Sequence, residues 1–566
     1  MKFLATLLSA FAVFHVNAQS NRPLGSWDDF LPYKNARMVA QSPDKIFCAT
    51  AASMYFVQKS DLYMERMSKC NGLSDIGFRA IEYDAPRQQV IVAYENSNID
   101  LWSESGVANI PDIKLKNIVG DKTIYHVYPD GDRAYLSMGF GIVVLDLEKR
   151  EVKDTYYIGT NGTDLKVNAV TTAFGRVFAA TADGLYTADA ASPALNNFNV
   201  WLRLDTASAL PHSAAHQVYH DGTRVFAVYH DSLFAYDGAA WTLIYSHPGF
   251  TLNHVKRFNA ELYVSEINLS TGAAQITLLD ASTNAVVNTM PGGEFIGNPM
   301  DVEVDETGRM WLADLFRGLS HSKNNAWSFI YPDGPGSANV WQIDAYRGNA
   351  YVAPGGLTTS GGFSFNEDGF FVFENNEWKT YSRYNHPAFS DSIKDIIGVS
   401  HNALTGKTYF TSFIEGGILE YENNAFTIYK QGIVSVDPAF YNHPTFDAVT
   451  DGNGNTWFSN PTTTKPLIVR TPDGQWKAFG FTGLPGTVGF TRLYADYNNR
   501  IWIVLKNEGL VVYDPGADVL SAADDDFRRL TATDGQGSLP SNTVLDVAMD
   551  LNGEVWIGTD KGIAVM

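Results

Sequence analysis

The sequence is poor in cysteine and in positive charge. Cys48 and Cys70 are the two cysteines of 566 residues. Their spacing neither requires nor forbids a disulfide in an oxidising compartment, so their pairing stays open. Lys and Arg number 41 against 62 Asp and Glu, which gives a formal net charge of −21. Such a chain is a poor partner for nucleic acid and, through its overall charge, for anionic membranes, although a local basic patch would still bind an anion.

Long apolar runs are also missing, except at the N-terminus. Lys2 precedes the apolar stretch LATLLSAFAVFHV, and Val16-Asn17-Ala18 before Gln19 fits a signal-peptidase site. We therefore predict a signal peptide over residues 1–18 and an exported mature chain. No cysteine follows the cleavage site, so the signal is not of the lipoprotein type. No other stretch approaches 18 apolar residues, and we predict no membrane span.

What the sequence does contain is typical of a folded all-β protein. Apolar residues make up 45%, charged residues 18% and aromatic residues 13%, and there are 48 glycines. Aromatic and β-branched residues between glycine-containing turns favour strands and hairpins. The length is too great for one ordinary core, so we expect two domains or a repeat array.

A repeat organises the chain. Four segments begin with Asp, pass through a short polar turn and reach Trp six residues later; these segments are DETGRMWLADLFRGLS (305–320), DGNGNTWFSN (451–460), DYNNRIWIVLKNEGLVVYD (496–514) and DLNGEVWIGTDKGIAVM (550–566). Weaker copies bring the count to twelve, and their spacing averages about 46 residues, within the range of propeller blades. Their central positions are Phe47, Ile91, Tyr135, Phe178, Phe226, Tyr263, Trp311, Tyr351, Tyr409, Trp457, Trp502 and Trp556.

Each copy predicts four antiparallel strands, which we call a, b, c and d. Strand d carries an aromatic pattern such as AAWTLIY (239–245) or NEWKTY (376–381). One such sheet cannot bury both faces alone, so a ring of sheets is expected: an all-β fold of two tandem β-propellers, with about seven blades in the first and an incomplete second. The tryptophans expected to mark the repeat are Trp27, Trp241, Trp311, Trp327, Trp378, Trp457, Trp476, Trp502 and Trp556.

The two chain ends carry unmatched pieces of the repeat. GSWDDFLPY (25–33) matches strand d, but no a, b or c precedes it. WIGTDKGIAVM at the other end supplies b and c, but no d follows. We therefore expect the N-terminal strand to close a ring, and which ring it closes stays open.

Several motifs imitate functional sites but are better explained by turns. DGNGN (451–455) resembles a calcium loop, yet it occupies the a–b turn and has Thr462 where the twelfth-position Glu belongs. Gly139 and Gly141 precede a strand and not the helix that a dinucleotide site needs. His212, His216, His220 and His230 cluster, but four residues on a strand span roughly 13 Å, too far for one metal. We predict no catalytic residue, metal or cofactor, and the binding residues stay unknown.

Residues 68–170 carry a more specific signal. SKCNGLSDIGFRAIEYD (68–84), NSNIDLWSESGVANIPDIKLKNIVGDKTIYHVY (96–128) and RAYLSMGFGIVVLDLEKREVKDTYYIG (133–159) resemble the N-terminal propeller of the PorZ-like family of the Bacteroidetes type IX (Por) secretion system. The resemblance extends over about 25–566, and the wider two-component regulator propeller repeat is less specific.

The resemblance implies two seven-bladed propellers followed by a C-terminal β-sandwich sorting domain. It also implies export to the periplasm and then to the outer-membrane surface. The partners implied are a sortase-like protease, an outer-membrane barrel protein and anionic lipopolysaccharide, with the propeller protein as a non-catalytic scaffold. We expect a first propeller over 19–335 and a second over 336–566, which lacks the last two blades and the sorting domain.

Two other functions remain open. The chain would also suit the periplasmic glycan-sensing part of a hybrid two-component regulator, which would continue into a membrane span and a kinase. Propellers also host enzymes such as lyases and quinoproteins. An enzyme would need catalytic groups gathered at the central channel, and none stands out in the sequence.

Overall fold

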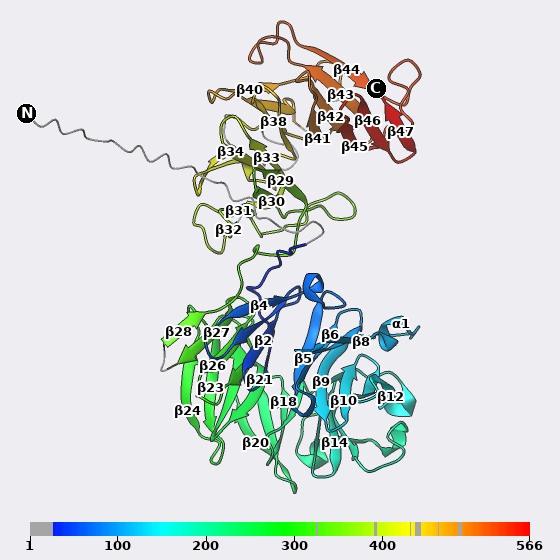
Figure 1. The fold of residues 1–566 in the computed structure, drawn as a ribbon, viewed down its shortest axis with the longest axis vertical. Helices are drawn as coiled ribbons and strands as arrows, with labels where there is room; N and C mark the ends of the chain where they lie inside the picture. The colour runs from blue at the N-terminus through cyan, green and yellow to red at the C-terminus, as the bar shows by residue number, and fades with distance from the viewer. Residues whose placement is uncertain are drawn as a thin grey trace, which may run out of the picture.

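The computed structural model describes residues 27–323, 326–389, 393–430, 432–435, 443–461, 463–484 and 489–566. The predicted signal peptide, residues 1–18, lies outside this part. The described residues form two β-propellers, one above the other along the longest axis of the molecule in Figure 1. The predicted fold class is confirmed.

The first propeller consists of seven four-stranded antiparallel sheets, which we call blades 1 to 7. Their strands are β1 Met38–Gln41, β2 Lys45–Ala49, β3 Met54–Gln58 and β4 Met64–Met67; β5 Phe78–Asp84, β6 Gln89–Tyr94, β7 Ile99–Ser103 and β8 Gly106–Ile110; β9 Ile124–Asp130, β10 Arg133–Met138, β11 Gly141–Asp146 and β12 Glu151–Tyr156; β13 Val167–Ala173, β14 Arg176–Thr181, β15 Gly184–Asp189 and β16 Leu202–Leu204; β17 Gln217–His220, β18 Val225–Tyr229, β19 Ser232–Tyr236 and β20 Trp241–Ser246; β21 Thr251–Phe258, β22 Glu261–Ile267, β23 Ala274–Asp280 and β24 Val286–Pro291; β25 Pro299–Val304, β26 Met310–Asp314, β27 Gly318–Lys323 and β28 Ala326–Phe329.

The second propeller has five sheets, blades 8 to 12, of which blade 12 has three strands. Their strands are β29 Gln342–Tyr346, β30 Asn349–Ala353, β31 Phe370–Glu374 and β32 Glu377–Tyr381; β33 Lys394–Asn402, β34 Lys407–Ile414, β35 Gly417–Glu422 and β36 Ala425–Tyr429; β37 Ala448–Thr450, β38 Thr456–Ser459, β39 Leu467–Arg470 and β40 Trp476–Phe479; β41 Phe490–Ala495, β42 Ile501–Leu505, β43 Gly509–Asp514 and β44 Asp526–Leu530; β45 Val544–Met549, β46 Val555–Thr559 and β47 Gly562–Val565. The domain boundary predicted at 335/336 falls between β28 and β29 and stays a prediction.

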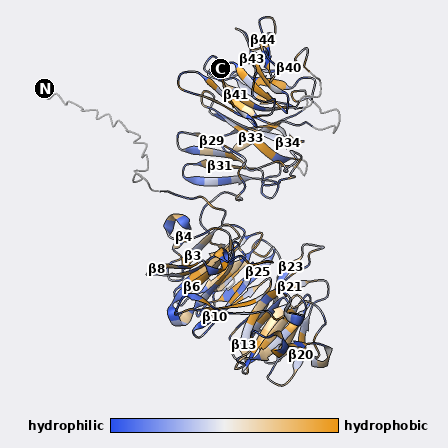
Figure 2. Cartoon of the chain, turned by 90° about the vertical axis from the view of Figure 1, so that its right-hand side faces the viewer, coloured by the Kyte–Doolittle hydropathy of each residue, from blue (hydrophilic) through white to orange (hydrophobic). Residues whose placement is uncertain are grey.

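All twelve repeat centres lie in the second strand of a blade, from Phe47 in β2 to Trp556 in β46. Hydrophobic residues run along the strands of both propellers (Figure 2). The cores lie between neighbouring blades, because each sheet buries its faces against the next. Trp311 and Leu319 of blade 7 pack with Ile46 and Tyr55 of blade 1, and this core closes the first ring.

The rings are also held at their axis. The first strand of each blade is a sheet edge, and its unpaired N–H groups need partners. Side chains of the preceding blade supply some of them. The N–H of Val39 donates to Asp301 Oδ2 at 3.0 Å between blades 7 and 1. In the second propeller the N–H of Leu493 donates to Asp447 Oδ2 at 2.9 Å. The same device therefore links blades in both propellers.

The expected N-terminal strand is absent from the described residues. Residues 27–37 contain no strand, so the prediction that residues 25–33 supply strand d is wrong over its described part. The physical reason is that blade 1 takes four consecutive strands from residues 38–67, so its fourth strand is β4 and it needs no strand from the N-terminus. The first ring is closed by complete blades.

The N-terminal segment instead lies between the two propellers. The Phe30 ring is 5.0 Å from Phe373 and 5.6 Å from Trp378 in blade 8, measured between centroids. Tyr33 is buried against Tyr55 of blade 1 at 5.5 Å. The segment therefore contacts the first blade of each propeller.

Helices are few in the described part of the chain. They are α1 (Asp112–Leu115) and five short 3-10 helices at Lys69–Asn71, Ala85–Arg87, Thr160–Gly162, Phe198–Val200 and Thr206–Ser208. None of these helices is long and apolar enough to cross a membrane. Cys48 is buried, Cys70 is exposed, and both are free thiols, which answers the question that their spacing left open.

Candidate functional site

The Asp–Trp pairs of the repeat form one defined turn. Asp451 follows β37, and its Oδ1 accepts the N–H groups of Asn453 and Asn455, each at 2.9 Å. Its Oδ2 accepts the indole N–H of Trp457 at 2.9 Å. A single carboxylate thus satisfies the tight turn and the buried indole, and this explains why the repeat needs both residues at that spacing.

The same indole bond recurs in three other blades. It joins Trp311 to Asp305 at 3.0 Å, Trp502 to Asp496 at 3.1 Å and Trp556 to Asp550 at 3.4 Å. Burial raises the pKa of Asp305, but the hydrogen bonds from Thr307 and Trp311 outweigh it and hold that pKa below its usual value. These tryptophans stabilise blades and line no common site.

The other repeat tryptophans have separate positions. Trp241, Trp327, Trp378 and Trp476 lie in the fourth strands β20, β28, β32 and β40, as strand d requires. Trp27 is 79% exposed and belongs to no strand, because the segment that carries it does not enter a blade. Their role as repeat markers stays a prediction; only Trp327 lines a cavity described below.

The axis of the first propeller gathers titratable groups that sequence reasoning missed. We call Glu82, His126, His254, Lys256, Asp301 and Glu303 the axial cluster. They lie on β5, β9, β21 and β25, the first strands of blades 2, 3, 6 and 7. The signal that could have pointed to this cluster is the polar residues that recur in the first strand of each blade. The sequence alone does not show which of these strands face one another across the axis.

Ion pairs and hydrogen bonds hold the axial cluster together. Lys256 Nζ is 2.5 Å from Glu303 Oε1, and the Gln41 side chain donates to the other Glu303 oxygen at 2.7 Å. His254 Nε2 is 3.3 Å from Asp301 Oδ1. Because Asp301 also accepts the Val39 N–H, both acids have structural partners.

Burial and charge shift the titration of the axial cluster. Burial raises the pKa of Glu82 to about 7, although Lys256 opposes the change. Burial, helped by His254 and Lys256, lowers the pKa of His126 to about 4. Burial alone would lower the pKa of Lys256, but Glu303 and Glu82 outweigh it and raise that pKa.

The axial cluster does not assemble a metal centre. No group of three or more His, Cys, Asp or Glu side chains in the described ranges is arranged to hold a metal ion. In the histidine cluster noted in the sequence, His212 contacts the Arg203 guanidinium, 2.7 Å from its Nε2, whereas burial and the nearby His230 lower the pKa of His216. Asp451, the first residue of the segment that resembles a calcium loop, uses both carboxylate oxygens for hydrogen bonds within its own turn and to Trp457. The axial cluster therefore crosslinks blades through charge.

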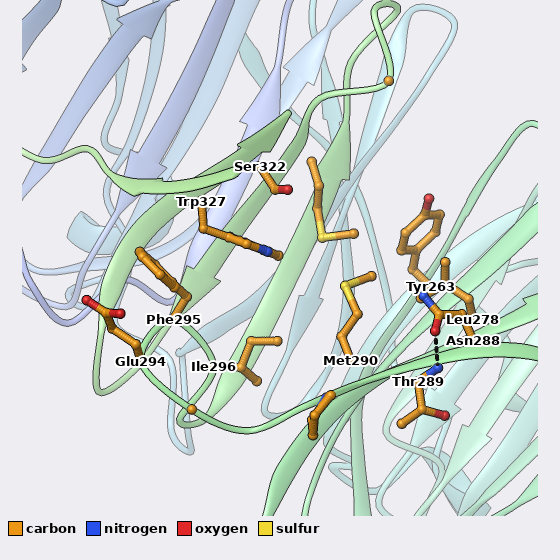
Figure 3. A pocket seen from close by; sticks show the side chains of 14 residues that line it. Tyr263, Leu278, Asn288, Thr289, Met290, Glu294, Phe295, Ile296, Ser322 and Trp327 are labelled. Carbon is orange, nitrogen blue, oxygen red and sulfur yellow. Dashed lines mark hydrogen bonds between the residues drawn. The ribbon is translucent and has the colours of Figure 1, made fainter. Parts of the chain in front are cut away.

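A second feature is a cavity of about 500 Å³ between blades 6 and 7, shown in Figure 3. Its apolar lining includes Leu278, Met290 and Trp327. The rings of Phe295 and Trp327 are stacked, with centroids 5.8 Å apart. Among the described residues, Glu294 is the one charged residue that lines it, beside the polar side chains of Asn288, Thr289 and Ser322. The lining is therefore mixed in polarity, and its described part offers no cation to an anionic ligand.

The comparisons with known proteins agree with the fold. A family model described as the PorZ N-terminal β-propeller domain of the type IX secretion system matches residues 46–202. No curated protein matches the chain.

Solved structures give a broader match. The structure of PorZ, from Porphyromonas gingivalis, aligns with a TM-score of 0.80 at 19% identity, over 96% of this chain and 73% of that one. The extracellular domain of the putative hybrid two-component system BT4673 from B. thetaiotaomicron gives a TM-score of 0.40 at 14% identity, over 95% of this chain and 72% of its own. A second such domain, BT3049, gives 0.41 at 13% identity, over 94% and 81%. Residues 46–202, which lie within the first propeller, are therefore similar to the PorZ N-terminal β-propeller domain, and the two-propeller fold is similar to that of the PorZ structure.

Proposed function

We propose that this protein is a non-catalytic surface component of a type IX secretion system. The family match over residues 46–202, within the first propeller, carries this proposal. The structure with the similar two-propeller fold is described as an essential surface component of that system. The axial cluster is consistent with a structural role, because Asp301 and Glu303 bind lysine, histidine, glutamine or backbone groups of the protein itself.

We further propose that the protein is a scaffold for the sortase attachment complex of this system, which would remove the C-terminal signals of secreted cargo and join the cargo to lipopolysaccharide. Its partners would be a sortase-like protease and an outer-membrane barrel protein, and its ligand would be anionic lipopolysaccharide. Export through the signal peptide over residues 1–18 would bring it to the periplasm and then to the outer-membrane surface. Because the chain carries a net charge of −21, lipopolysaccharide binding would require a local cationic site and would weaken with salt.

Deletion of the gene tests the proposal. Secreted cargo is expected to keep its C-terminal signal and to accumulate in the periplasm. The full-length gene should restore processing, whereas a version without residues 1–18 should not. Normally processed cargo on the surface of the deletion strain would contradict the proposal.

A further inference from the structure

One end of the second propeller carries an apolar cavity of about 350 Å³, which we call the funnel. All five blades contribute to it. Trp341 precedes β29, Phe413 lies on β34, Phe446 precedes β37, Val504 lies on β42 and Leu545 lies on β45. Convergence of every blade on one cavity is typical of a ligand site on this kind of fold.

The walls of the funnel are aromatic and remain accessible. The ring centroids of Phe363 and Phe413 are 5.0 Å apart, and those of Phe413 and Phe446 are 5.4 Å apart. Trp341 is 39% exposed and Leu545 is 58% exposed. Covering such apolar surface is favourable, so the funnel favours the apolar part of a ligand.

Two cationic side chains line the same cavity. Arg492 lies on β41, and Lys506 directly follows β42 in the same sheet; both side chains line the funnel and are exposed. Neither forms an ion pair within the described ranges. In a chain with a net charge of −21, two cations that line the same cavity favour an anionic ligand there.

The nearby acids have other partners. Asp447 Oδ2 accepts the Leu493 N–H at 2.9 Å, and Asp546 Oδ1 accepts the Tyr494 hydroxyl at 2.5 Å. Both acids and the Tyr494 side chain also act on Arg492. Lys506, by contrast, forms no ion pair in the part of the chain that the structure describes, and it lines the cavity as an exposed cation.

We propose that the funnel binds an amphipathic anion, with an acyl or aryl body against the aromatic walls and a carboxylate or phosphate head at Lys506 and Arg492. The cavity between blades 6 and 7 is the internal contrast, because Glu294 is its charged residue and repels such a head. The volume suits a single chain and not a folded domain. The inference rests on the funnel alone and does not depend on the secretion proposal.

Calorimetric titration of the purified protein with four probes of equal chain length tests the ligand class. Decanoate and decyl phosphate should bind, while decanol and decyltrimethylammonium should bind at least tenfold more weakly. Equal binding of the cationic probe, or no binding of either anion, would overturn the proposal.

Variants test the site. Lys506→Glu should weaken decanoate binding at least tenfold and leave decanol binding unchanged, and Arg492→Gln should weaken it less. Phe413→Ala should weaken all probes. Lys561→Glu is the matched control, because Lys561 is an exposed cation of the same propeller outside the funnel, and it should bind like the wild type. Thermal melting monitors folding. Unchanged decanoate affinity in a folded Lys506→Glu, Arg492→Gln double variant would also overturn the proposal.

A vesicle arm identifies the source of the ligand. Co-sedimentation with phosphatidylglycerol vesicles that depends on Lys506 would support a membrane lipid as the amphiphile. Decanoate binding without co-sedimentation would support a free amphiphile.

Discussion

The two propellers are built from the same blade, but different chemistry gathers at their axes. In the first, the axial cluster places three acids, one lysine and two histidines on inner strands and ties blades together by charge. In the second, aromatic side chains converge on the funnel with two exposed cations. The blade is fixed by turns and inter-blade cores, whereas the axial residues are free to differ. Function is therefore to be sought where the two propellers diverge.

The largest effect is expected at the charged axis. Lys256→Met leaves Glu303 and Glu82 without their cation, and removing one partner of a buried pair costs about 3–5 kcal/mol of unfolding free energy. The matched change in the second propeller, Lys506→Met, removes an exposed cation and should cost less than about 0.5 kcal/mol. Denaturant unfolding of both variants measures the difference.

A compensating change controls for lost packing at that position. Adding Glu303→Gln to Lys256→Met should recover part of the stability, because fewer buried charges then lack a partner. Equal stabilities of Lys256→Met and Lys506→Met would contradict the contrast between the two axes.

A second test asks whether the Asp–Trp turn acts alike in both propellers. Trp311→Phe in the first and Trp457→Phe in the second should each cost roughly 2–3 kcal/mol, since each removes a donor from a buried aspartate and leaves a void. Both tryptophans are fully buried, whereas Trp556 is 44% exposed and its bond to Asp550 is longer. Trp556→Phe should therefore cost less than about 1 kcal/mol. Similar losses at Trp457 and Trp556, read from melting curves, would count against this account of the turn.

A third test concerns the pH dependence of stability. His126 has a folded-state pKa of about 4, below its usual 6.5, so the unfolded chain binds more protons between these values. Its contribution to stability is present above pH 6.5 and is lost as the pH falls toward 4, at most about 3 kcal/mol. His126→Gln should flatten this acid-side loss.

Glu82 should act in the opposite sense. Its folded-state pKa of about 7 lies above the usual 4.5, so its contribution is present below pH 4.5 and is lost as the pH rises toward 7. Glu82→Gln should flatten that change. The titratable groups that act on Glu82 or His126 are His254, Lys256, Asp301 and Glu303. Unfolding free energies of the wild type and of both variants, measured from pH 4 to 8, check both signs. If the contributions of His126 and Glu82 changed with pH in the same direction, the two assigned pKa shifts would be contradicted.

Local pattern was enough to predict the blades. The spacing of Phe47, Ile91 and the later repeat centres reflects strand period and turn chemistry, which act over a few residues. The Asp–Trp spacing likewise pointed to a real turn. The N-terminal strand was the error, because a local match to strand d does not show whether a sheet has a free edge.

The axial cluster and the funnel could not be predicted from the sequence, and the reason is different. Glu82, Lys256 and Glu303 meet only because a ring brings blades 2, 6 and 7 together, and no local pattern encodes that meeting. The funnel similarly draws residues from five blades, none of which is unusual in its own segment. Periodicity predicts the repeating unit, but side-chain chemistry at the axis depends on the closed arrangement.

The position of the N-terminal segment has a consequence for the order of assembly. Val39 and its partner Asp301 are 262 residues apart in sequence, and Phe30 must wait still longer for Phe373 and Trp378. Contacts at such separation form late and slowly, because a long loop must close first. Until blade 7 is made, β1 presents an unpaired edge to other chains. Phe30 and Val39 are thus among the last residues to find their partners, and the folding chain is most open to misassembly in the interval before Phe30 docks.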